Sequence, residues 1–273
     1  MSVLPEIDLN IIKAELTDFI KNITIKSKLN NVILGLSGGI DSTLVAYILN
    51  GSLANENIYT YHLYSSTTPN KDRKHAKLIS KKLNLNYLEI PIDNILSKYL
   101  YEFDNVLDTN IIDDNNAKLS LANLNARVRM SILYYFANLK NGLVSGTGNR
   151  SELLIGYLTK FGDGACDFEL IGDIYKTQVK ELAKDLEIPK VIINKAPRAG
   201  LWDNQADEDE IGMTYDILDQ LLYLIVDKKL ENKDILKQIN ISKIEINRIR
   251  NMVKNSMHKI QSPPTPFKNK KLF

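Results

Sequence analysis

Residues 32–42, VILGLSGGIDS, constrain the fold of this chain more than any other segment. A short apolar run ends in a Ser-Gly-Gly turn, and apolar residues at helical spacing follow, from Leu44 to Leu49. This order predicts a strand, a glycine loop and the N-terminus of a helix. The backbone N–H groups of such a loop and the positive end of the helix dipole together form an anion site.

Asp41 adds a carboxylate to this predicted anion site. Gly38 and Gly39 allow a phosphate close to the backbone because they lack Cβ atoms, whereas Asp41 would repel it. A divalent cation between the two groups removes that repulsion, so the pattern predicts Mg²⁺ together with phosphate. The alternative is an ordinary glycine turn. The loop lacks the Gly-Lys-Ser/Thr ending of a Walker A sequence and the third glycine of a dinucleotide fingerprint.

Composition places the chain among globular proteins. It has 273 residues, of which 44% are hydrophobic and 25% charged. A net charge of +2 predicts no strong general attraction to nucleic acid. The single cysteine, Cys166, excludes an intrachain disulfide and fits a reducing compartment. Because no signal-like segment and no run of about 18 apolar residues is present, we expect a soluble cytoplasmic protein without a membrane partner.

Hydrophobic periodicity alternates between strand and helix over most of the chain. Strands are expected over 58–64, 87–90 and 142–145, and helices over 11–20, 71–83, 92–103, 121–139 and 175–186. Residues 104–116 are polar and predict a loop, and the pattern is wholly helical from Glu208. The alternation predicts an α/β fold, a doubly wound parallel sheet flanked by helices with a helical C-terminal part. We expect one domain over residues 1–273, with an extended tail over 263–273.

Two segments carry further candidate ligands. Asn123 and Arg127 lie four residues apart on the predicted helix and therefore share a face, whereas Arg129 points elsewhere. The planar guanidinium of Arg127 suits a carboxylate or a phosphate, although solvated polar positions are the alternative. The second segment, GTGNRSE at residues 146–152, follows a strand, where ligand loops of parallel sheets occur.

In the GTGNRSE segment, Thr147 is suited to a nucleotide and Glu152 to Mg²⁺ opposite Asp41. The alternative is a helix cap at Asn149 or Ser151, and the two roles are compatible.

Residues 160–167, KFGDGACD, form a glycine-interrupted loop that contains Lys160, Asp163 and Asp167. This pattern is typical of a mobile active-site loop and equally of a surface turn. Cys166 is expected to be a small buried residue, because no nucleophile motif lies nearby. Lys176 begins a predicted helix, where a lysine opposes the helix dipole, and this position favours phosphate contact.

Together these segments resemble ammonia-dependent NAD synthetases, which belong to the ATP pyrophosphatase (PP-loop) group. The resemblance runs from residue 32 to about residue 266 and rests on the motifs GLSGGIDS, NLNARVRM, GTGNRSELLIGY, GDGACD, IGDIYKTQVKELA, APRAGLW with DEDEIG, and MHK. It implies a ligase that makes NAD⁺ from deamido-NAD⁺, ATP and ammonia through an adenylated intermediate, in the last step of NAD biosynthesis. It also implies a homodimer.

The resemblance also implies roles by position. The implied ATP contacts are Gly35, Leu36, Ser37, Gly38, Gly39, Ile40, Asp41, Ser42, Thr147, Lys176 and Arg198. The implied deamido-NAD⁺ contacts are Arg127, Lys160, Asp167, His258 and Lys259. Asp41 and Glu152 would bind Mg²⁺, and Asp163 would bind or deprotonate ammonium. The implied catalytic residues are Asp41, Lys176 and Asp163. Arg198 stands where the family often has Ser or Thr, and no adenosine contacts are assigned within residues 63–75.

Two other functions are compatible with the glycine loop. A tRNA thiolase of the same group usually has additional cysteines and a basic surface for RNA, which one cysteine and a net charge of +2 disfavour. A nucleotide-binding regulator would not turn over, whereas the co-occurrence of Asp41, Glu152 and Lys176 favours catalysis. The chain contains no recognisable amidase domain, so we do not expect it to use glutamine by itself. A separate glutaminase partner is the alternative to free ammonia.

Overall fold

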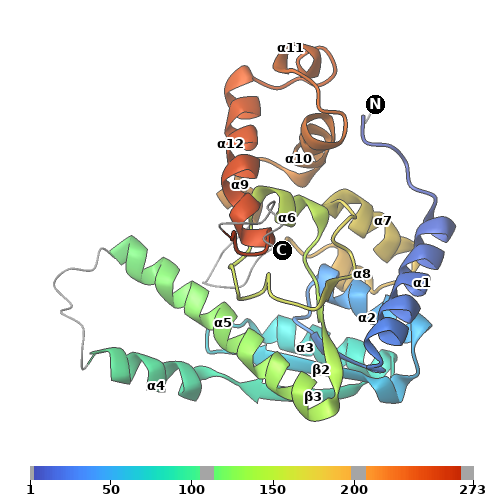
Figure 1. The fold of residues 1–273 in the computed structure, drawn as a ribbon, viewed down its shortest axis with the longest axis vertical. Coiled ribbons are helices and arrows are strands. Elements are labelled where there is room, and N and C mark those ends of the chain that lie inside the picture. The colour runs from blue at the N-terminus through green and yellow to red at the C-terminus, as the bar shows by residue number, and fades with distance from the viewer. Residues whose placement is uncertain (1–2, 105–113, 198–206, 266–273) are drawn as a thin grey trace, which may run out of the picture.

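The computed structural model describes residues 3–104, 114–197 and 207–265. Among these residues, five parallel strands form one sheet in the order β3-β2-β1-β4-β5 (Figure 1). The strands are β1 (Asn31–Gly35), β2 (Ile58–Tyr64), β3 (Asn86–Pro91), β4 (Gly142–Gly146) and β5 (Phe168–Glu169). The predicted doubly wound parallel sheet and its strands over 58–64, 87–90 and 142–145 are confirmed. The two-residue strand β5 is not predicted.

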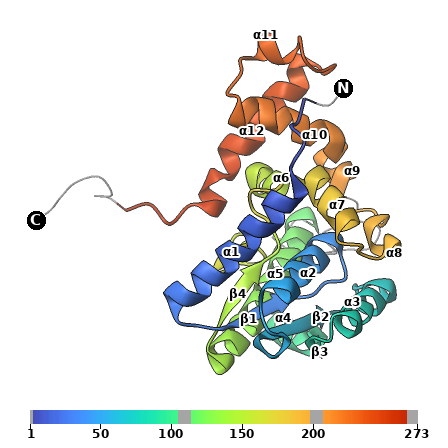
Figure 2. The ribbon, with the colours of Figure 1, turned by 90° about the vertical axis from the view of Figure 1, so that its right-hand side faces the viewer.

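Helices cover both faces of the sheet (Figures 1 and 2). Strand β1 explains why, since successive side chains of a strand point to opposite faces. Val32 and Leu34 pack in one core cluster, whereas Ile33 packs in another. The first cluster includes side chains of α1 (Leu9–Ser27), α2 (Ile40–Ser52), α3 (Asn70–Lys82) and α7 (Lys176–Asp185). The second includes side chains of α4 (Asp93–Asp104) and α5 (Asp114–Lys140).

A helical lobe adjoins the sheet through α6 (Arg150–Ile155) (Figure 1). Ile155 of this helix packs in the core of the lobe, beside Leu218 and Ile249. The other helices of the C-terminal region are α9 (Asp207–Ile211), α10 (Tyr215–Leu222), α11 (Asn232–Ile235) and α12 (Lys243–Ile260), with a π-helical turn at Tyr223–Asp227. The predicted helical C-terminal part is therefore confirmed.

The start of α5, two short helical elements and the expected tail differ from the expectation or lie partly outside the described residues. Helix α5 begins at Asp114, so the loop expected over 104–116 is wrong at its C-terminal end. The short helix α8 (Lys190–Ile193) lies before Pro197, and a 3₁₀ turn (Asn55–Asn57) precedes β2. Of the expected tail, residues 263–265 are exposed and form neither helix nor strand, whereas 266–273 lie outside the described residues.

Within the described ranges, no helix is both long and apolar enough to cross a membrane.

Candidate active site

The glycine loop connects β1 to α2 at the point where the strand order of the sheet reverses, between β1 and β4. In open α/β sheets, this crevice is where ligands bind. The Ser37 and Ser42 hydroxyl oxygens lie 2.9 Å apart, and the Gly39 N–H donates to Ser37 Oγ at 3.2 Å. Gly38 has a φ of +80°, and a Cβ atom there would lie 2.2 Å from the Asp72 carbonyl oxygen. Glycine is therefore required for the loop to pack against α3.

Asp41, Glu152 and Lys176 meet beside this loop. The Lys176 ammonium lies 2.6 Å from Asp41 Oδ2 and 3.1 Å from Glu152 Oε1. Only 2% of the Lys176 side chain is exposed. These residues come from the first turns of α2, α6 and α7, so the structure brings together three residues that the sequence assigned to one site. They are called the Asp41–Glu152–Lys176 cluster below.

Asn149 connects the cluster to the loop after β4. Its side chain accepts a hydrogen bond from the Glu152 N–H at 3.1 Å and donates to Asp41 Oδ1 at 3.1 Å. Glu152 in turn accepts from the Asn149 N–H, which completes a capping box at the start of α6. Of the two expected cap residues, Asn149 is the N-cap and Ser151 is not, and Asn149 also contacts the candidate site. Thr147 lies half-buried two residues earlier.

Burial controls the charges in the cluster. Burial alone would lower the pKa of Lys176, but Asp41 and Glu152 raise it above its usual value, so the ammonium stays charged. Burial raises the pKa of Glu152 to about 7, although the nearby Lys176 opposes this shift. Lys176 therefore keeps its charge in the interior, whereas burial disfavours the ionised form of Glu152 and the Lys176 ammonium favours it.

Two carboxylates on a common cationic centre match the donor set that Mg²⁺ takes in nucleotide sites, one or two carboxylates completed by phosphate oxygens and water. Asp41 and Glu152 both contact the Lys176 ammonium and so reach the same position. In the described part of the chain, His, Cys, Asp and Glu form no group of three that could hold a metal ion. The two carboxylates of Asp41 and Glu152 fit a cation whose other ligands are phosphate oxygens and water.

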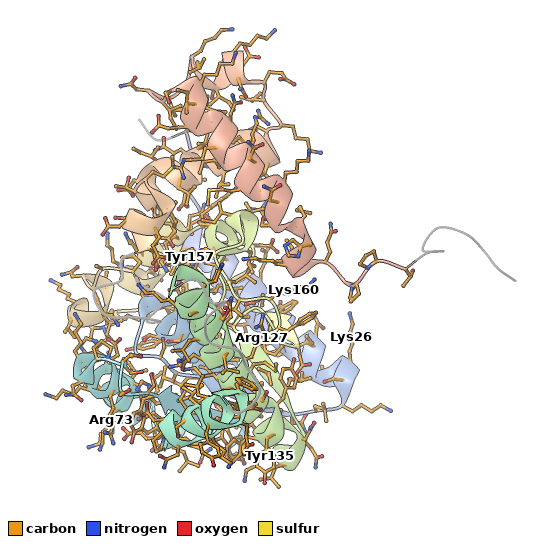
Figure 3. All side chains as sticks on the ribbon, turned by 90° about the vertical axis from the view of Figure 1, so that its left-hand side faces the viewer. Lys26, Arg73, Arg127, Tyr135, Tyr157 and Lys160 are labelled. Atoms are coloured by element: carbon orange, nitrogen blue, oxygen red, sulfur yellow. The ribbon has the colours of Figure 1, made fainter. Side chains whose placement is uncertain are left out.

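A second group of predicted residues lies where α5 meets the 157–167 loop (Figure 3). Thr159 Oγ1 donates to Asn123 Oδ1 at 2.7 Å, and Arg127 Nε donates to the Lys160 carbonyl oxygen at 3.3 Å. Asn123 and Arg127 thus face the same loop, as their spacing predicts. Arg129 instead donates to the Leu63 carbonyl at 2.8 Å.

The two aspartates of the loop contact backbone N–H groups. Asp163 is an exposed residue and accepts from the Thr159 N–H at 2.8 Å. Asp167 accepts from the Val144 N–H at 2.7 Å and from the Tyr134 hydroxyl at 3.3 Å. Both carboxylates therefore fix the loop. Its mobility and its substrate contacts stay predictions.

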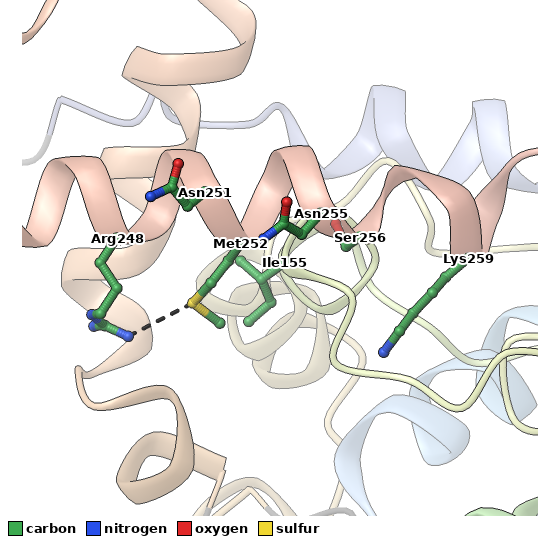
Figure 4. Close-up of a pocket in the computed structure, with 7 residues that line it drawn as sticks. All are labelled: Ile155, Arg248, Asn251, Met252, Asn255, Ser256 and Lys259. Atoms are coloured by element: carbon green, nitrogen blue, oxygen red, sulfur yellow. Dashed lines mark hydrogen bonds between the residues drawn. The ribbon is translucent and has the colours of Figure 1, made fainter.

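Lys259 and His258 lie in the last turn of α12. Lys259 Nζ donates to the Gly156 and Leu158 carbonyl oxygens at 2.7 and 2.9 Å, so it holds the segment that follows α6. Burial lowers the pKa of Lys259, and His258 is exposed. A surface pocket of about 380 Å³ adjoins Lys259 (Figure 4) and is lined by Ile155, Arg248, Asn251, Met252, Asn255, Ser256 and Lys259.

A buried ion pair behind the glycine loop is not predicted from the sequence. Lys195 Nζ lies 2.6 Å from Asp72 Oδ1 and also donates to the Gly38 carbonyl at 3.2 Å. It therefore fixes the loop against α3. Both residues lie in segments without a recognised motif, and 123 positions separate them. Arg198, the expected ATP contact three residues further along, lies outside the described residues.

Glu169 is a second unpredicted residue near the site. It accepts from the Gly148 N–H at 2.9 Å, and burial raises the pKa of Glu169 to about 7. Burial also raises the pKa of the half-buried Cys166 thiol, which agrees with the expectation that Cys166 is not a nucleophile.

Comparisons with known proteins identify the family of this chain. The NAD synthase family model matches residues 12–263. The NH(3)-dependent NAD(+) synthetase of Methanocaldococcus jannaschii is 40% identical over 259 residues, which cover 92% of this chain and 95% of the relative. The enzyme of the same name from Pyrococcus furiosus is 40% identical over 251 residues, 92% of each chain.

Solved structures show the same fold. NMN synthetase from Francisella tularensis matches with a TM-score of 0.81 and 30% identity, over 96% of this chain and 99% of that chain. The NH3-dependent NAD synthetase from Campylobacter jejuni matches with a TM-score of 0.78 and 31% identity, over 95% and 99%. The glycine loop, the Asp41–Glu152–Lys176 cluster and these full-length matches lead to one conclusion: this chain belongs to the NAD synthase family.

Proposed function

We propose that this chain catalyses the reaction of its family, the ATP-dependent amidation of deamido-NAD⁺ with ammonia to NAD⁺, at the crevice between β1 and β4. The meeting of Asp41, Glu152 and Lys176 beside the glycine loop is the observation that carries this proposal. It places a buried ammonium and two carboxylates next to backbone N–H groups that suit a pyrophosphate.

Activation by ATP explains why such a site is needed. A carboxylate does not react with ammonia, because oxide would have to leave. The nicotinate carboxylate therefore attacks the α-phosphorus of ATP, and pyrophosphate leaves. Ammonia then attacks the carbonyl carbon of the acyl-adenylate, and AMP leaves with the oxygen that came from the carboxylate.

The glycine loop and the residues of the cluster have different roles in this reaction. The glycine-loop amides and the start of α2 would stabilise the negative charge that develops on pyrophosphate. Lys176 would stabilise charge on the transferred phosphate, whose oxygens would compete with Asp41 and Glu152 for its ammonium. These two carboxylates would hold Mg²⁺, which when bound neutralises phosphate charge. We assign the remaining ATP contacts to Gly35–Ser42, Thr147 and Arg198.

The deamido-NAD⁺ contacts are proposed on the α5 side of the site. Arg127 and Lys160 meet there, and Lys259 joins the same loop through the Leu158 carbonyl. Asp167 and His258 complete the proposed set. Asp163, on the same loop, would attract ammonium and take its proton.

Substrate competition tests this proposal. Because the structurally similar Francisella protein is named an NMN synthetase, the purified chain should be assayed with deamido-NAD⁺ and with nicotinate mononucleotide, each with ammonium or glutamine. We expect kcat/KM to be at least about tenfold higher for deamido-NAD⁺, and ammonium to be the effective donor. A preference for the mononucleotide would reassign the acceptor, and absence of any amidation would refute the proposed reaction.

A homodimer is proposed through α4 and α5. Large apolar side chains are exposed on these two helices, and contiguous apolar surface is typical of an interface. They include Tyr99, Leu100, Phe103, Leu119, Leu121, Tyr135 and Leu139. The family resemblance favours a second copy as the partner. Sedimentation should show a dimer that Leu139→Asp with Tyr135→Glu converts to a monomer. An unchanged dimer would place the interface elsewhere.

We also propose a cytoplasmic location. Cys166 is half-buried, has no disulfide partner, and burial raises the pKa of its thiol. A free thiol of this kind fits the reducing cytoplasm. Cell fractionation with antibody detection tests this, and recovery in a membrane or exported fraction would contradict it.

A further inference from the structure

Helix α10 presents two buried polar side chains toward Lys176. Tyr215 and Asp219 lie four residues apart and therefore share one face of the helix. Both are fully buried. The Tyr215 ring centroid lies 5.3 Å from the Lys176 Nζ atom, within the range of a cation–π contact. Neither residue belongs to a motif assigned above.

Asp219 connects the first turns of two helices. Its Oδ1 accepts from the Ser151 hydroxyl at 2.5 Å, and its Oδ2 accepts from the Thr177 N–H and the Thr177 hydroxyl, each at 2.8 Å. Ser151 Oγ also accepts from the Lys176 N–H at 3.0 Å. One carboxylate thereby links α6 to α7.

These contacts lie next to the residues of the cluster. Ser151 precedes Glu152, and Thr177 follows Lys176, so each partner of Asp219 is one residue from a charged group of the site. A fully buried carboxylate carries a large desolvation cost, and its three hydrogen bonds offset that cost only while both helix starts stay in place. The carboxylate also faces the positive end of α7.

We propose that Asp219 is a positioning residue that fixes Lys176 relative to Glu152, and that it sets the rate of adenylation through this geometry. The inference rests on the proposed function, because the rate that it concerns is that of the proposed adenylation. In the proposed site Asp219 contacts neither ATP nor the acceptor and acts through Lys176 and Glu152. Displacements of about 1 Å at a reacting centre reduce rates by up to about 10²-fold.

The test compares Asp219→Asn with the matched variant Asp216→Asn, which makes the same chemical change on the exposed face of the same helix. Steady-state kinetics should show kcat lowered about 10- to 100-fold in Asp219→Asn. The KM values for ATP and for deamido-NAD⁺ should each change less than about threefold. Activity is normalised to the folded fraction from circular dichroism. Asp216→Asn should match the wild type. An unchanged kcat in Asp219→Asn, or a loss that only follows unfolding, would overturn the inference.

Hydrogen exchange supplies a readout that does not depend on turnover. The amides of Lys176 and Thr177 should exchange at least about tenfold faster in Asp219→Asn, whereas those in the middle of α12 should not change. Unchanged exchange at these two amides would also overturn the inference.

A second variant keeps the test informative if Asp219→Asn folds poorly. Ser151→Ala removes only a hydroxyl, and it should lower kcat in the same direction with faster exchange at Lys176. If the double variant Asp219→Asn with Ser151→Ala folds, its fold-loss in kcat should be smaller than the product of the two single losses. The reason is that both substitutions disrupt the same hydrogen-bond network. Wild-type protein without NAD⁺ formation would refute the proposed function, whereas an active wild type with an unaffected kcat in Ser151→Ala would refute only the role of Asp219.

Discussion

The Lys176 ammonium lies 2.6 Å from the Asp41 carboxylate, although 135 positions separate the two residues along the chain. The pair joins the start of α7 to the start of α2, directly beside the loop that suits a pyrophosphate. Each charge of the pair partly neutralises the other. Phosphate oxygens would attract the Lys176 ammonium, and a divalent cation would attract the Asp41 carboxylate. Both ligands would therefore weaken this ion pair, so we expect substrate binding to be coupled to its rearrangement.

Asp41→Asn should abolish most of the activity while the fold is kept. The change keeps the side-chain shape but removes a charge that we assign to the cation, and a loss of at least about 10²-fold in kcat is expected. NAD⁺ formation and circular dichroism measure the two properties. Asp216→Asn, at an exposed carboxylate on α10, is the matched control. Near-normal turnover of Asp41→Asn would show that the proposed metal role is wrong.

Lys176→Met should separate metal binding from catalysis. Without the ammonium, Asp41 and Glu152 become available to a cation, so MgCl₂ without ATP should raise the melting temperature of this variant more than that of the wild type at pH 8. Turnover should be lost. Lys180→Met, on the same helix, should respond to MgCl₂ as the wild type does. If the Lys176→Met response equalled the wild-type response, the two carboxylates would not form a cation site.

Glu169 should make stability depend on pH. Burial raises its pKa from the usual 4.5 to about 7, so the folded protein binds this proton more tightly than the unfolded chain does. The resulting stabilisation is complete below pH 4.5 and is lost as the pH rises through 7.

Glu169→Gln keeps a neutral side chain at every pH. The melting temperature of the wild type minus that of Glu169→Gln should therefore fall between pH 5 and pH 8. Glu181→Gln, an exposed position on α7, should show no such trend. A difference for Glu169→Gln that stays constant over this range would contradict the raised pKa.

Arg127→Ala should weaken the acceptor more than ATP. The guanidinium lies on α5 against the 157–167 loop, which we assign to deamido-NAD⁺. We expect KM for deamido-NAD⁺ to rise about tenfold, as the loss of one charged contact implies, and KM for ATP to rise less than about twofold. The KM of Arg127→Lys for deamido-NAD⁺ should lie between that of the wild type and that of Arg127→Ala, because a lysine keeps the charge without the planar guanidinium. A larger effect on ATP would reassign the residue.

The parts of the fold that could be predicted from sequence are those set by local pattern. Period-2 and helical spacing predict β2 and α7 within a residue or two. The acid at Glu152 predicts a cap at Asn149 or Ser151, and the structure shows Asn149 in that position. Strand β5 spans only Phe168–Glu169 and is too short to show a period. The polar start of α5 has no apolar stripe, so its first turns resembled a loop.

The candidate site could be predicted where motifs carry it and not where long-range packing does. Asp41, Glu152 and Lys176 each lie in a recognisable segment, and the structure brings them together. Asp219 and its partner Ser151 are separated by 68 positions, and no local spacing indicates their contact. Asp167 lies in a recognisable segment and its carboxylate accepts from the Val144 N–H, so its contact with deamido-NAD⁺ stays a prediction.

Oxygen transfer tests the central claim most directly. Deamido-NAD⁺ labelled with ¹⁸O in its nicotinate carboxylate should be converted with unlabelled ATP and ammonium, and the products analysed by mass spectrometry. Attack of the carboxylate on the α-phosphorus predicts one ¹⁸O atom in each AMP formed, with none in pyrophosphate. Label in orthophosphate together with ADP, or AMP without label, would contradict adenylation at the Asp41–Glu152–Lys176 cluster.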